Sequence, residues 1–328
     1  MASLPFLLFT IFLSLVASNA LSPSSVASQQ SKFWSQNVDN NMPQSIRSKL
    51  SPLSELETKA FTPLVSKQYF TSNPKFCTSA NLVCASAVKP IPCVFYHEVH
   101  FTDKVTVPIE EADPWSFFRL SILKNGNKVT LPELDSKFPN RAFLPSQIAT
   151  SFRLRESELQ RIFPIALSIP STKASVDMSL HHCDAPTVKG ERRSCLKTLE
   201  DMIEFSRDSL GRKHLVALAS DNTKVLGNQV VMVKNVIKPY KTEKIVACHE
   251  LFFPFATYYC HMLPLTEVYG VDVINKRGAI NKLFAICHTD TSSWTPNHVA
   301  FKLLKTSPGK GEVCHWIGEM DLLWVGYD

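Results

Sequence analysis

The chain has little glycine and no hydrophobic stretch long enough to cross a bilayer. Only 10 of its 328 residues are glycine, which excludes a glycine-rich fibrous protein. No glycine-rich phosphate loop and no βαβ alternation is present, which argues against a nucleotide-binding fold. The main apolar run, Leu4 to Val16, has 13 residues, whereas a membrane-spanning helix needs about 20. We therefore expect no membrane span.

Basic runs with interleaved aromatic residues are also absent, so a nucleic-acid partner is not expected. The sequence contains no Asn-x-Ser/Thr acceptor site, and N-glycosylation is not expected either. The formal charge is 35 − 29 = +6. A basic protein can adhere to a polyanionic matrix such as de-esterified pectin, but the charge is equally consistent with ordinary solubility.

The N-terminus predicts secretion. The apolar run is followed by "ASNALSP", in which Ser18 and Ala20 are small residues at the positions that signal peptidase prefers. We expect a signal peptide over residues 1–20, cleaved after Ala20, even though no Lys or Arg precedes the run. Disulfides persist outside the cell, and the count of 9 cysteines leaves at least one without an internal partner.

Three further segments follow from composition. Residues 21–70 are rich in Ser, Gln and Asn, which predicts a largely extended, variable arm. Within it, Ser54 and Glu57 have capping-box spacing, so one short helix is expected near Ser54–Ala60. Residues 71–114 form a connecting segment in which two of three cysteines could pair, namely Cys77, Cys84 and Cys93. A folded domain is expected over residues 115–328.

The folded domain reads as α+β, mostly β in the C-terminal half. Helices are expected in "PWSFFRLSIL", around Ser157–Phe163, and in "RRSCLKTLEDMIEFSRDSL", where Gly211 follows as a stop. A strand is expected at residues 99–109. The later strand-like runs are "HLVALAS", "NQVVMVKNVI", "EKIVACHELFF", "VYGVDVI", "KLFAICH", "HVAFKLL", "EVCHWIG" and "DLLWVGY".

Four Cys-His dipeptides occupy the last third of the chain. They are separated by 10, 25 and 25 residues: Cys248-His249, Cys260-His261, Cys287-His288 and Cys314-His315. Successive side chains of a strand point to opposite faces. Four such strands brought together would therefore give a cysteine layer, able to form disulfides in pairs, and a separate histidine layer. Which cysteines pair is left open by the spacing, and adjacent pairing is the simplest arrangement.

Clustered imidazoles without thiolate suit copper or zinc, and copper is the more natural redox metal outside the cell. A zinc finger is disfavoured because its ligands come in pairs two to four residues apart. A cysteine protease is disfavoured because four equal dipeptides single out no activated thiol. Histidines that simply hydrogen-bond at strand ends are the structural alternative.

The spacing of these dipeptides resembles the signature of the plant BURP domain. The pair Phe117-Phe118 opens the similar region, and "AICHTDTSSWTPNHVAF" and "EVCHWIGEMDLLW" resemble its closing blocks. The resemblance covers about residues 115–328. It implies a disulfide-stabilised secreted domain in the apoplast or cell wall, with "RRSCLKTLEDMIEFS" as a cysteine-containing helix and Cys183 as the disulfide partner of Cys195.

Within that family, "SKFWSQNVDNNMPQS", "NRAFLP" and "YYCHMLP" are most similar to the non-catalytic beta-subunit of polygalacturonase. The chain lacks the Phe- and Tyr-containing repeat array of that type. The resemblance implies a non-catalytic wall protein that associates with matrix pectin or with a wall enzyme such as polygalacturonase.

The family also contains copper-dependent peptide cyclases, and whether the chain is an enzyme is left open. The resemblance implies a copper site on His249, His261, His288 and His315, acting on a separate peptide because the arm holds no repeated core peptide. His298 is a candidate ligand or proton carrier, or else a buried hydrogen-bonded residue. Asp290 could orient a ligating imidazole or cap a turn. Tyr258 and Tyr259 could line a cleft, although a core role is expected for at least one of them because they alternate faces. His181-His182 could bind metal but is expected on a surface loop.

Overall fold

The computed structural model describes residues 25–66, 74–88, 114–135, 138–185, 191–220, 228–238, 240 and 244–328. Three sequence predictions lie outside these residues. They are the signal peptide at residues 1–20, the strand at residues 99–109, and any role of Cys93.

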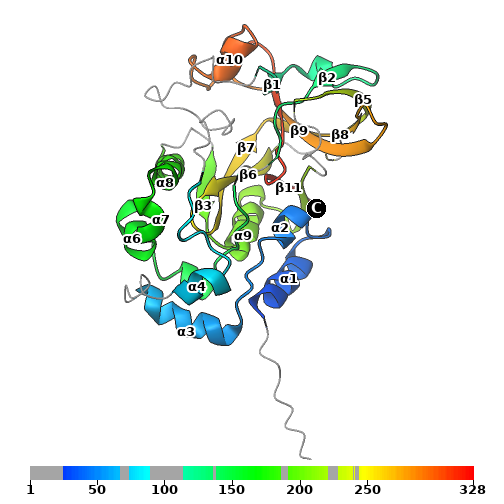
Figure 1. Cartoon of the computed structure of the whole chain (residues 1–328). Helices are drawn as coiled ribbons and strands as arrows, with labels where there is room; N and C mark the ends of the chain where they lie inside the picture. Colours follow the sequence, from blue (N-terminus) through cyan, green and yellow to red (C-terminus); the bar gives the residue numbers. More distant parts are fainter. Residues whose placement is uncertain are drawn as a thin grey trace, which may run out of the picture.

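Two antiparallel sheets organise the described part of the chain (Figure 1). The first has the strand order β1 (Phe117–Phe118), β10 (Val313–Trp316), β9 (Ile280–His288), β8 (Thr266–Ile274), β5 (Val230–Ile237), β2 (Lys128–Thr130). The second has the order β3 (Arg192–Leu196), β7 (Ala256–Pro264), β6 (Lys244–Phe252), β11 (Leu322–Tyr327), β4 (His214–Leu218). We call them the six-stranded and the five-stranded sheet.

The two sheets pack face to face through one apolar layer. The five-stranded sheet contributes Val216, Ile245, Ala247, Leu263, Leu323 and Val325, and the six-stranded side contributes Val268, Phe284, Ile286 and Ile317. Along β6, Ile245 and Ala247 are two residues apart, as strand alternation requires for one face. We call this layer the inter-sheet layer, because residues in phase with it point between the sheets.

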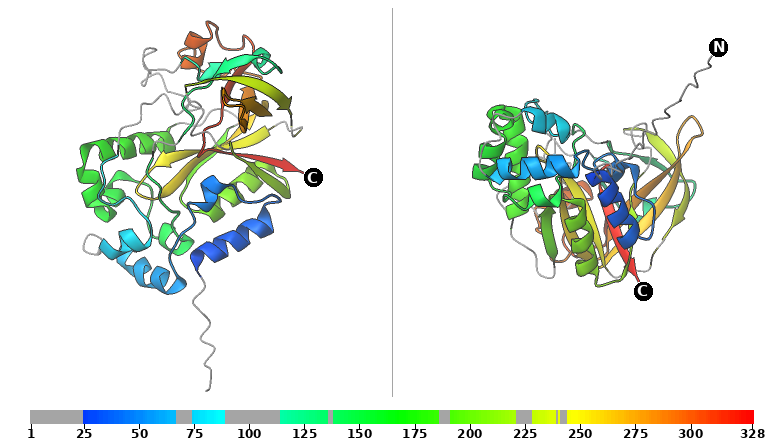
Figure 2. Two further views of the ribbon diagram at one scale, coloured as in Figure 1. Left: turned by 45° about the vertical axis from the view of Figure 1, so that its right-hand side comes forward. Right: turned by 90° about the horizontal axis from the view of Figure 1, so that it is seen from below.

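Helices cover the opposite face of the five-stranded sheet and the end of its β6–β7 hairpin (Figures 1 and 2). Their bounds are α1 Val26–Asn37, α2 Gln44–Arg47, α3 Glu55–Ser66, α4 Pro74–Ser79, α5 Ser146–Ala149, α6 Glu156–Ile162, α7 Pro164–Ser168, α8 Pro170–Asp184 and α9 Leu199–Leu210. Two short helices, η4 Leu120–Ile122 and α10 Val299–Leu303, pack beside the six-stranded sheet instead.

Helix α9 is the amphipathic helix that its sequence predicts. The Thr198 side chain accepts a hydrogen bond from the Asp201 N–H at 3.0 Å, which satisfies a donor of the first turn. Leu199, Met202 and Ile203 are fully buried on one side. Gly211 ends the helix with φ +64°, a left-handed conformation that favours glycine. The helix at Ser157–Phe163 is confirmed as well, as α6.

The extended arm predicted at residues 21–70 is wrong for its described residues, which form α1, α2 and α3. Apolar and amide groups recur at helical spacing in α1, with Val26, Gln30 and Trp34 buried. The Trp34 ring lies 5.5 Å from that of Trp324 on β11. The expected capping box is present but starts a longer helix than predicted: Ser54 and Glu57 exchange hydrogen bonds of 2.9 and 3.2 Å. The polar composition of the segment therefore does not exclude helices, because they bury a few apolar side chains together with polar ones such as Gln30.

Four shorter predictions are also wrong. "PWSFFRLSIL" forms β1 and the short η4, because Phe117 and Phe118 pair with β10. "HVAFKLL" forms α10 with Val299, Ala300 and Phe301 buried, so its apolar run is a helix face. Cys195 lies on β3, ahead of the helix, and His181-His182 lies on α8 rather than on a surface loop.

The fold class is confirmed as α+β, with strands predominating in the C-terminal half and disulfides closing the domain. None of the helices in the described ranges is long and apolar enough to span a membrane.

Candidate histidine site

Two disulfides join neighbouring strands at directly opposed residues. Cys248 on β6 faces Cys260 on β7, and Cys287 on β9 faces Cys314 on β10. Both pairs are bonded, and both have a Cα–Cα separation of 4.0 Å. The structure thus has the adjacent pairing, one cross-strand disulfide in each sheet. Cys248 and Cys260 point toward α9, whereas Cys287 and Cys314 point toward the outer core of the six-stranded sheet.

The histidine that follows each cysteine points to the other side. His249 is two residues beyond Ala247 and His261 two before Leu263, and both of these apolar residues belong to the inter-sheet layer. His288 follows Ile286 and His315 precedes Ile317 in the same way, and these residues complete the layer from the second sheet. All four imidazoles therefore point between the sheets, at the margin of the inter-sheet layer.

The registers place the four rings as two diagonal pairs. The centroids of His249 and His261 are 5.5 Å apart, and those of His288 and His315 are 5.7 Å apart. All four residues are buried, with exposed fractions of 9% or less. Within the ranges the structure describes, no group of three or more His, Cys, Asp or Glu side chains is placed to hold a metal ion. The single four-histidine centre stays a prediction.

Carboxylates orient the pair on the five-stranded sheet. The His261 Nδ1 lies 3.0 Å from the Glu191 Oε1, and that carboxylate is nearly buried, at 5% exposed. The His249 Nδ1 lies 3.3 Å from the Asp321 Oδ2. An ionised carboxylate can only accept, so these contacts favour the tautomer with the hydrogen on Nδ1.

Neutral oxygens orient the pair on the six-stranded sheet. The His315 Nδ1 lies 3.1 Å from the Trp316 carbonyl oxygen, which can only accept. The His288 Nδ1 lies 3.2 Å from the Thr266 hydroxyl. That hydroxyl donates its one hydrogen to the Pro264 carbonyl at 3.1 Å, and so it accepts from Nδ1–H.

The oxygen contacts of all four rings consequently favour one tautomer, with the hydrogen on Nδ1 and the lone pair on Nε2. A metal-ligating histidine usually donates one ring N–H to an oxygen partner, which leaves the lone pair of the other ring nitrogen for the metal. Neutral imidazole also suits copper chemically. The residues predicted as ligands therefore suit a copper ion by the chemistry of their donor atoms, and the copper site itself stays a prediction.

His298 has the opposite arrangement. Its Nδ1 accepts a hydrogen bond from the Ala300 N–H at 3.2 Å, which caps α10 and places the ring hydrogen on Nε2. The ring is buried and lies 4.5 Å from Trp294. Of its two predicted roles, the geometry matches the buried, hydrogen-bonded one.

Asp290 is exposed and accepts from the Ser292 N–H at 2.9 Å. Hydrogen bonds from the Ser292 side chain and from its backbone N–H lower the pKa of the Asp290 carboxyl. This is the geometry of a turn cap, the second of the two roles considered for it. The carboxylates beside the histidines are Asp321 and Glu191 instead.

Several side chains surround the His249–His261 pair. Tyr259 stacks 5.0 Å from His261, and the Arg193 guanidinium lies 5.8 Å from the Tyr259 ring. Burial, reinforced by the charges of His181, His249 and Arg193, lowers the pKa of His182 to about 3. Tyr258 points to the opposite side, stacked 5.8 Å from Phe143. Both tyrosines are buried, which matches the core role expected for at least one of them.

Two further disulfides hold the segments around the sheets. Cys183 on α8 bonds Cys195 on β3, as the family resemblance implies. Cys77 bonds Cys84, with a Cα–Cα separation of 6.0 Å. The Val83 N–H donates to the Pro254 carbonyl at 2.8 Å, which ties that small loop to the β6–β7 hairpin.

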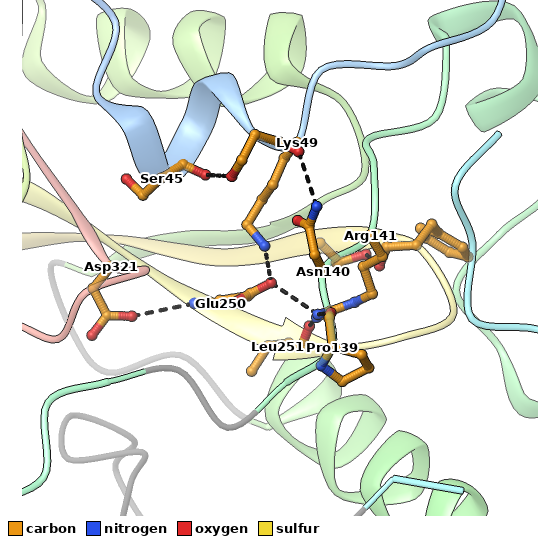
Figure 3. A network of polar contacts seen from close by, with 11 residues as sticks. Ser45, Lys49, Pro139, Asn140, Arg141, Glu250, Leu251 and Asp321 are labelled. Carbon is orange, nitrogen blue, oxygen red and sulfur yellow. Dashed lines mark hydrogen bonds and ion pairs between the residues drawn. The ribbon is translucent and has the colours of Figure 1, made fainter. Parts of the chain in front are cut away.

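A buried ionic network adjoins His249 (Figure 3). Glu250 Oε1 lies 2.5 Å from Lys49 Nζ and 2.9 Å from Arg141 Nη1. The Glu250 N–H donates to Asp321 Oδ1 at 3.3 Å, and the other oxygen of that carboxylate faces His249. A chain of contacts thus runs from Lys49, just after α2, through β6 to His249.

Sequence reasoning missed Glu191, Asp321 and this network. The sole signal for the network is that Glu250 sits inside an apolar run, where an isolated charge needs a partner. Nothing in the sequence near Lys49 or Arg141 identifies that partner, since Lys49 is 201 residues away from Glu250.

The chain was compared with known proteins. The family model described as "BURP domain" matches residues 116–326. The chain is 38% identical over 221 residues to "Polygalacturonase non-catalytic subunit AroGP3" of Solanum lycopersicum, covering 66% of this chain and 35% of that protein. It is 39% identical over 218 residues to "Polygalacturonase-1 non-catalytic subunit beta" of the same species, covering 65% and 34%.

A third relative matches over most of its length. "BURP domain-containing protein 16" of Oryza sativa subsp. japonica is 31% identical over 329 residues, covering 94% of this chain and 91% of that protein. By contrast, the chain spans about a third of the length of the tomato subunits. What it shares with them is therefore confined to one part of those proteins.

Proposed function

The chain belongs to the BURP family, and from that premise we propose that it is a secreted, non-catalytic protein of the plant cell wall or apoplast. It associates there with wall matrix or with a wall enzyme such as polygalacturonase. The observation that carries this proposal is the 38–39% identity to proteins named as polygalacturonase non-catalytic subunits, over the domain that holds the histidines and both cross-strand disulfides.

The disulfides support an extracellular setting. Four bonded cysteine pairs occur in the described residues, and such bonds persist where the surroundings are oxidising. The signal peptide predicted at residues 1–20 supports the same setting. A rigid double sheet with cross-strand staples suits a protein that presents a surface to a partner.

A binding experiment tests this proposal. The full chain, produced by secretion, is immobilised and exposed to purified polygalacturonase and, separately, to polygalacturonate. We expect saturable binding of the enzyme with no pectin-cleaving activity from the chain alone. Absence of binding to both probes would remove the proposed association.

The donor geometry favours a second candidate function, a copper-dependent peptide cyclase acting on a separate peptide. The specific observation is the shared tautomer favoured in His249, His261, His288 and His315, whose Nε2 atoms would hold the ion. When bound, copper would supply the redox chemistry. The chain's own contribution is to orient the rings through Glu191, Asp321, Thr266 and the Trp316 carbonyl.

Copper analysis of the secreted protein distinguishes the two candidates. The second predicts at least one copper ion per chain, reduced in His288→Ala and retained in His214→Ala, a matched change at an exposed histidine of β4. It also predicts that a peptide substrate changes mass in the presence of copper and oxygen. Wild-type protein that takes up no copper would eliminate the cyclase.

A further inference from the structure

One end of the six-stranded sheet exposes apolar side chains. The registers align Ile280, Ile274, Met232 and Lys128 in one row across four strands. By alternation this row lies on the same face as Phe284 of the inter-sheet layer. Exposed fractions are 44% for Val230, 37% for Met232 and 61% for Ile280. Figure 2, right, shows these strands projecting away from helices α6–α8.

Ile237 lies on the same face, further along β5. It is opposite Gly270 on β8 and is 44% exposed. A Cβ on Gly270 would lie 3.0 Å from the Ile237 Cγ1, so the glycine lets the isoleucine side chain lie across the strand. An aliphatic surface of this kind, kept at a sheet end, indicates a contact with another molecule.

The same surface is strongly positive. Lys128, Lys234 and Lys282 are exposed on β2, β5 and β9, and Lys276 and Arg277 are exposed in the β8–β9 turn. Of the two carboxylates on β8, Asp272 accepts from Asn235 at 3.3 Å, and Glu267 is left out of the count because it pairs with Lys238. Five cations and one carboxylate give a local charge of 5 − 1 = +4. Lys238 is left out because it pairs with Glu267 at 2.5 Å.

We infer that this surface, the cationic strand-end face, docks a protein partner whose own surface has an apolar centre and an acidic rim. The charge requires an acidic partner. The aliphatic row favours a protein over a polysaccharide, because it offers no hydrogen bonds to hydroxyl groups. A second copy of this chain is disfavoured, since a two-fold contact would oppose +4 to +4. The inference rests on the proposed function and assigns the enzyme's docking site.

The test uses the full chain and purified polygalacturonase as the probe. The face variant is Lys128→Gln/Lys234→Gln/Lys282→Gln. Its matched control is Lys32→Gln/Lys59→Gln/Lys302→Gln, three exposed lysines on α1, α3 and α10 with the same total charge change. A second pair is Ile280→Asp on the face and Leu56→Asp on α3, which is 65% exposed. All substituted positions are exposed, so the variants are expected to melt like wild type.

We expect both face variants to weaken binding at least tenfold, the lysine variant mainly through slower association and a weaker salt dependence. Both controls should stay within twofold. Hydrogen exchange in the complex should protect residues 230–237 and 270–284.

Four results would overturn the inference. If wild type binds the enzyme but the face variants bind equally well, the docking site is wrong while the proposed function stands. If wild type binds polygalacturonate but not the enzyme, the docking inference fails while matrix association stands, and if it binds neither probe, both fail. If only the lysine variant weakens, and polygalacturonate binding falls in parallel, the face is a polysaccharide site instead.

Discussion

The substitution Glu250→Gln tests the role of Glu250 in the buried network that connects Lys49, just after α2, to His249. The Glu250 side chain is 3% exposed, and the Lys49 and Arg141 side chains it contacts are 1% and 0% exposed. Burial lowers the pKa of Lys49, and the Glu250 carboxylate opposes that shift. With glutamine, two buried cations would lose their carboxylate while keeping a similar shape around them.

We therefore expect a large loss in the free energy of unfolding. Removing one partner of a buried ion pair costs about 3–5 kcal/mol, because the remaining charge stays desolvated. A domain of roughly 250–300 residues has an unfolding entropy of about 0.5–0.6 kcal/mol/K, so a loss of ~4 kcal/mol lowers Tm by about 6–8 °C. Near-UV circular dichroism during heating, with disulfides intact, measures this shift.

Two companion variants make the result interpretable. Glu156→Gln makes the same chemical change at a carboxylate 60% exposed, paired with Lys173, and should move Tm by less than about 1 °C because exposed pairs contribute little. Lys49→Met/Glu250→Gln removes one of the two cations that lack a carboxylate partner, so it should recover part of the decrease in Tm. A Glu250→Gln protein that melts like Glu156→Gln would refute the assignment of a charged, buried network.

Three further predictions concern the elements around the site. The pKa of His182 is about 3 in the folded chain against 6.5 in the unfolded chain, so the unfolded chain binds the proton first. The free energy of unfolding therefore falls as the pH drops from about 6.5 toward 3, by up to ~1.4 kcal/mol per pH unit. Urea midpoints measured between pH 7 and 4.5 should show this slope, and the slope should be smaller in His182→Gln. Thr198→Ala should lower the free energy of unfolding by about 1 kcal/mol, because it removes the side-chain cap of α9. Thr198→Ser should unfold in urea close to wild type, and equal losses of stability in both variants would contradict the cap. His298→Ala should destabilise more than His298→Asn, which retains a capping acceptor for α10, and neither should alter copper content; copper lost from both would make His298 a ligand.

The sequence alone determined the local features that depend on neighbours along the chain. Helix α9 was predictable because its apolar spacing, N-cap and terminal glycine all act within a few residues. The opposite orientation of each cysteine and its histidine was predictable for the same reason, since alternation is a property of any strand. The BURP family was recognisable from the spacing of those dipeptides. Composition misled at residues 21–70, where buried Trp34 and Gln30 belong to a mostly polar helix.

Only the tertiary structure decided which residues meet. Strand register placed Cys248 opposite Cys260 and set the histidines as two diagonal pairs. Glu191 and Asp321, which favour one ring tautomer, come from outside the histidine strands and carry no marker in the sequence. Lys49 reaches Glu250 across 201 residues. Such contacts depend on how whole layers pack, because a buried charge is tolerated only where packing brings it a partner, and that partner can come from any part of the chain.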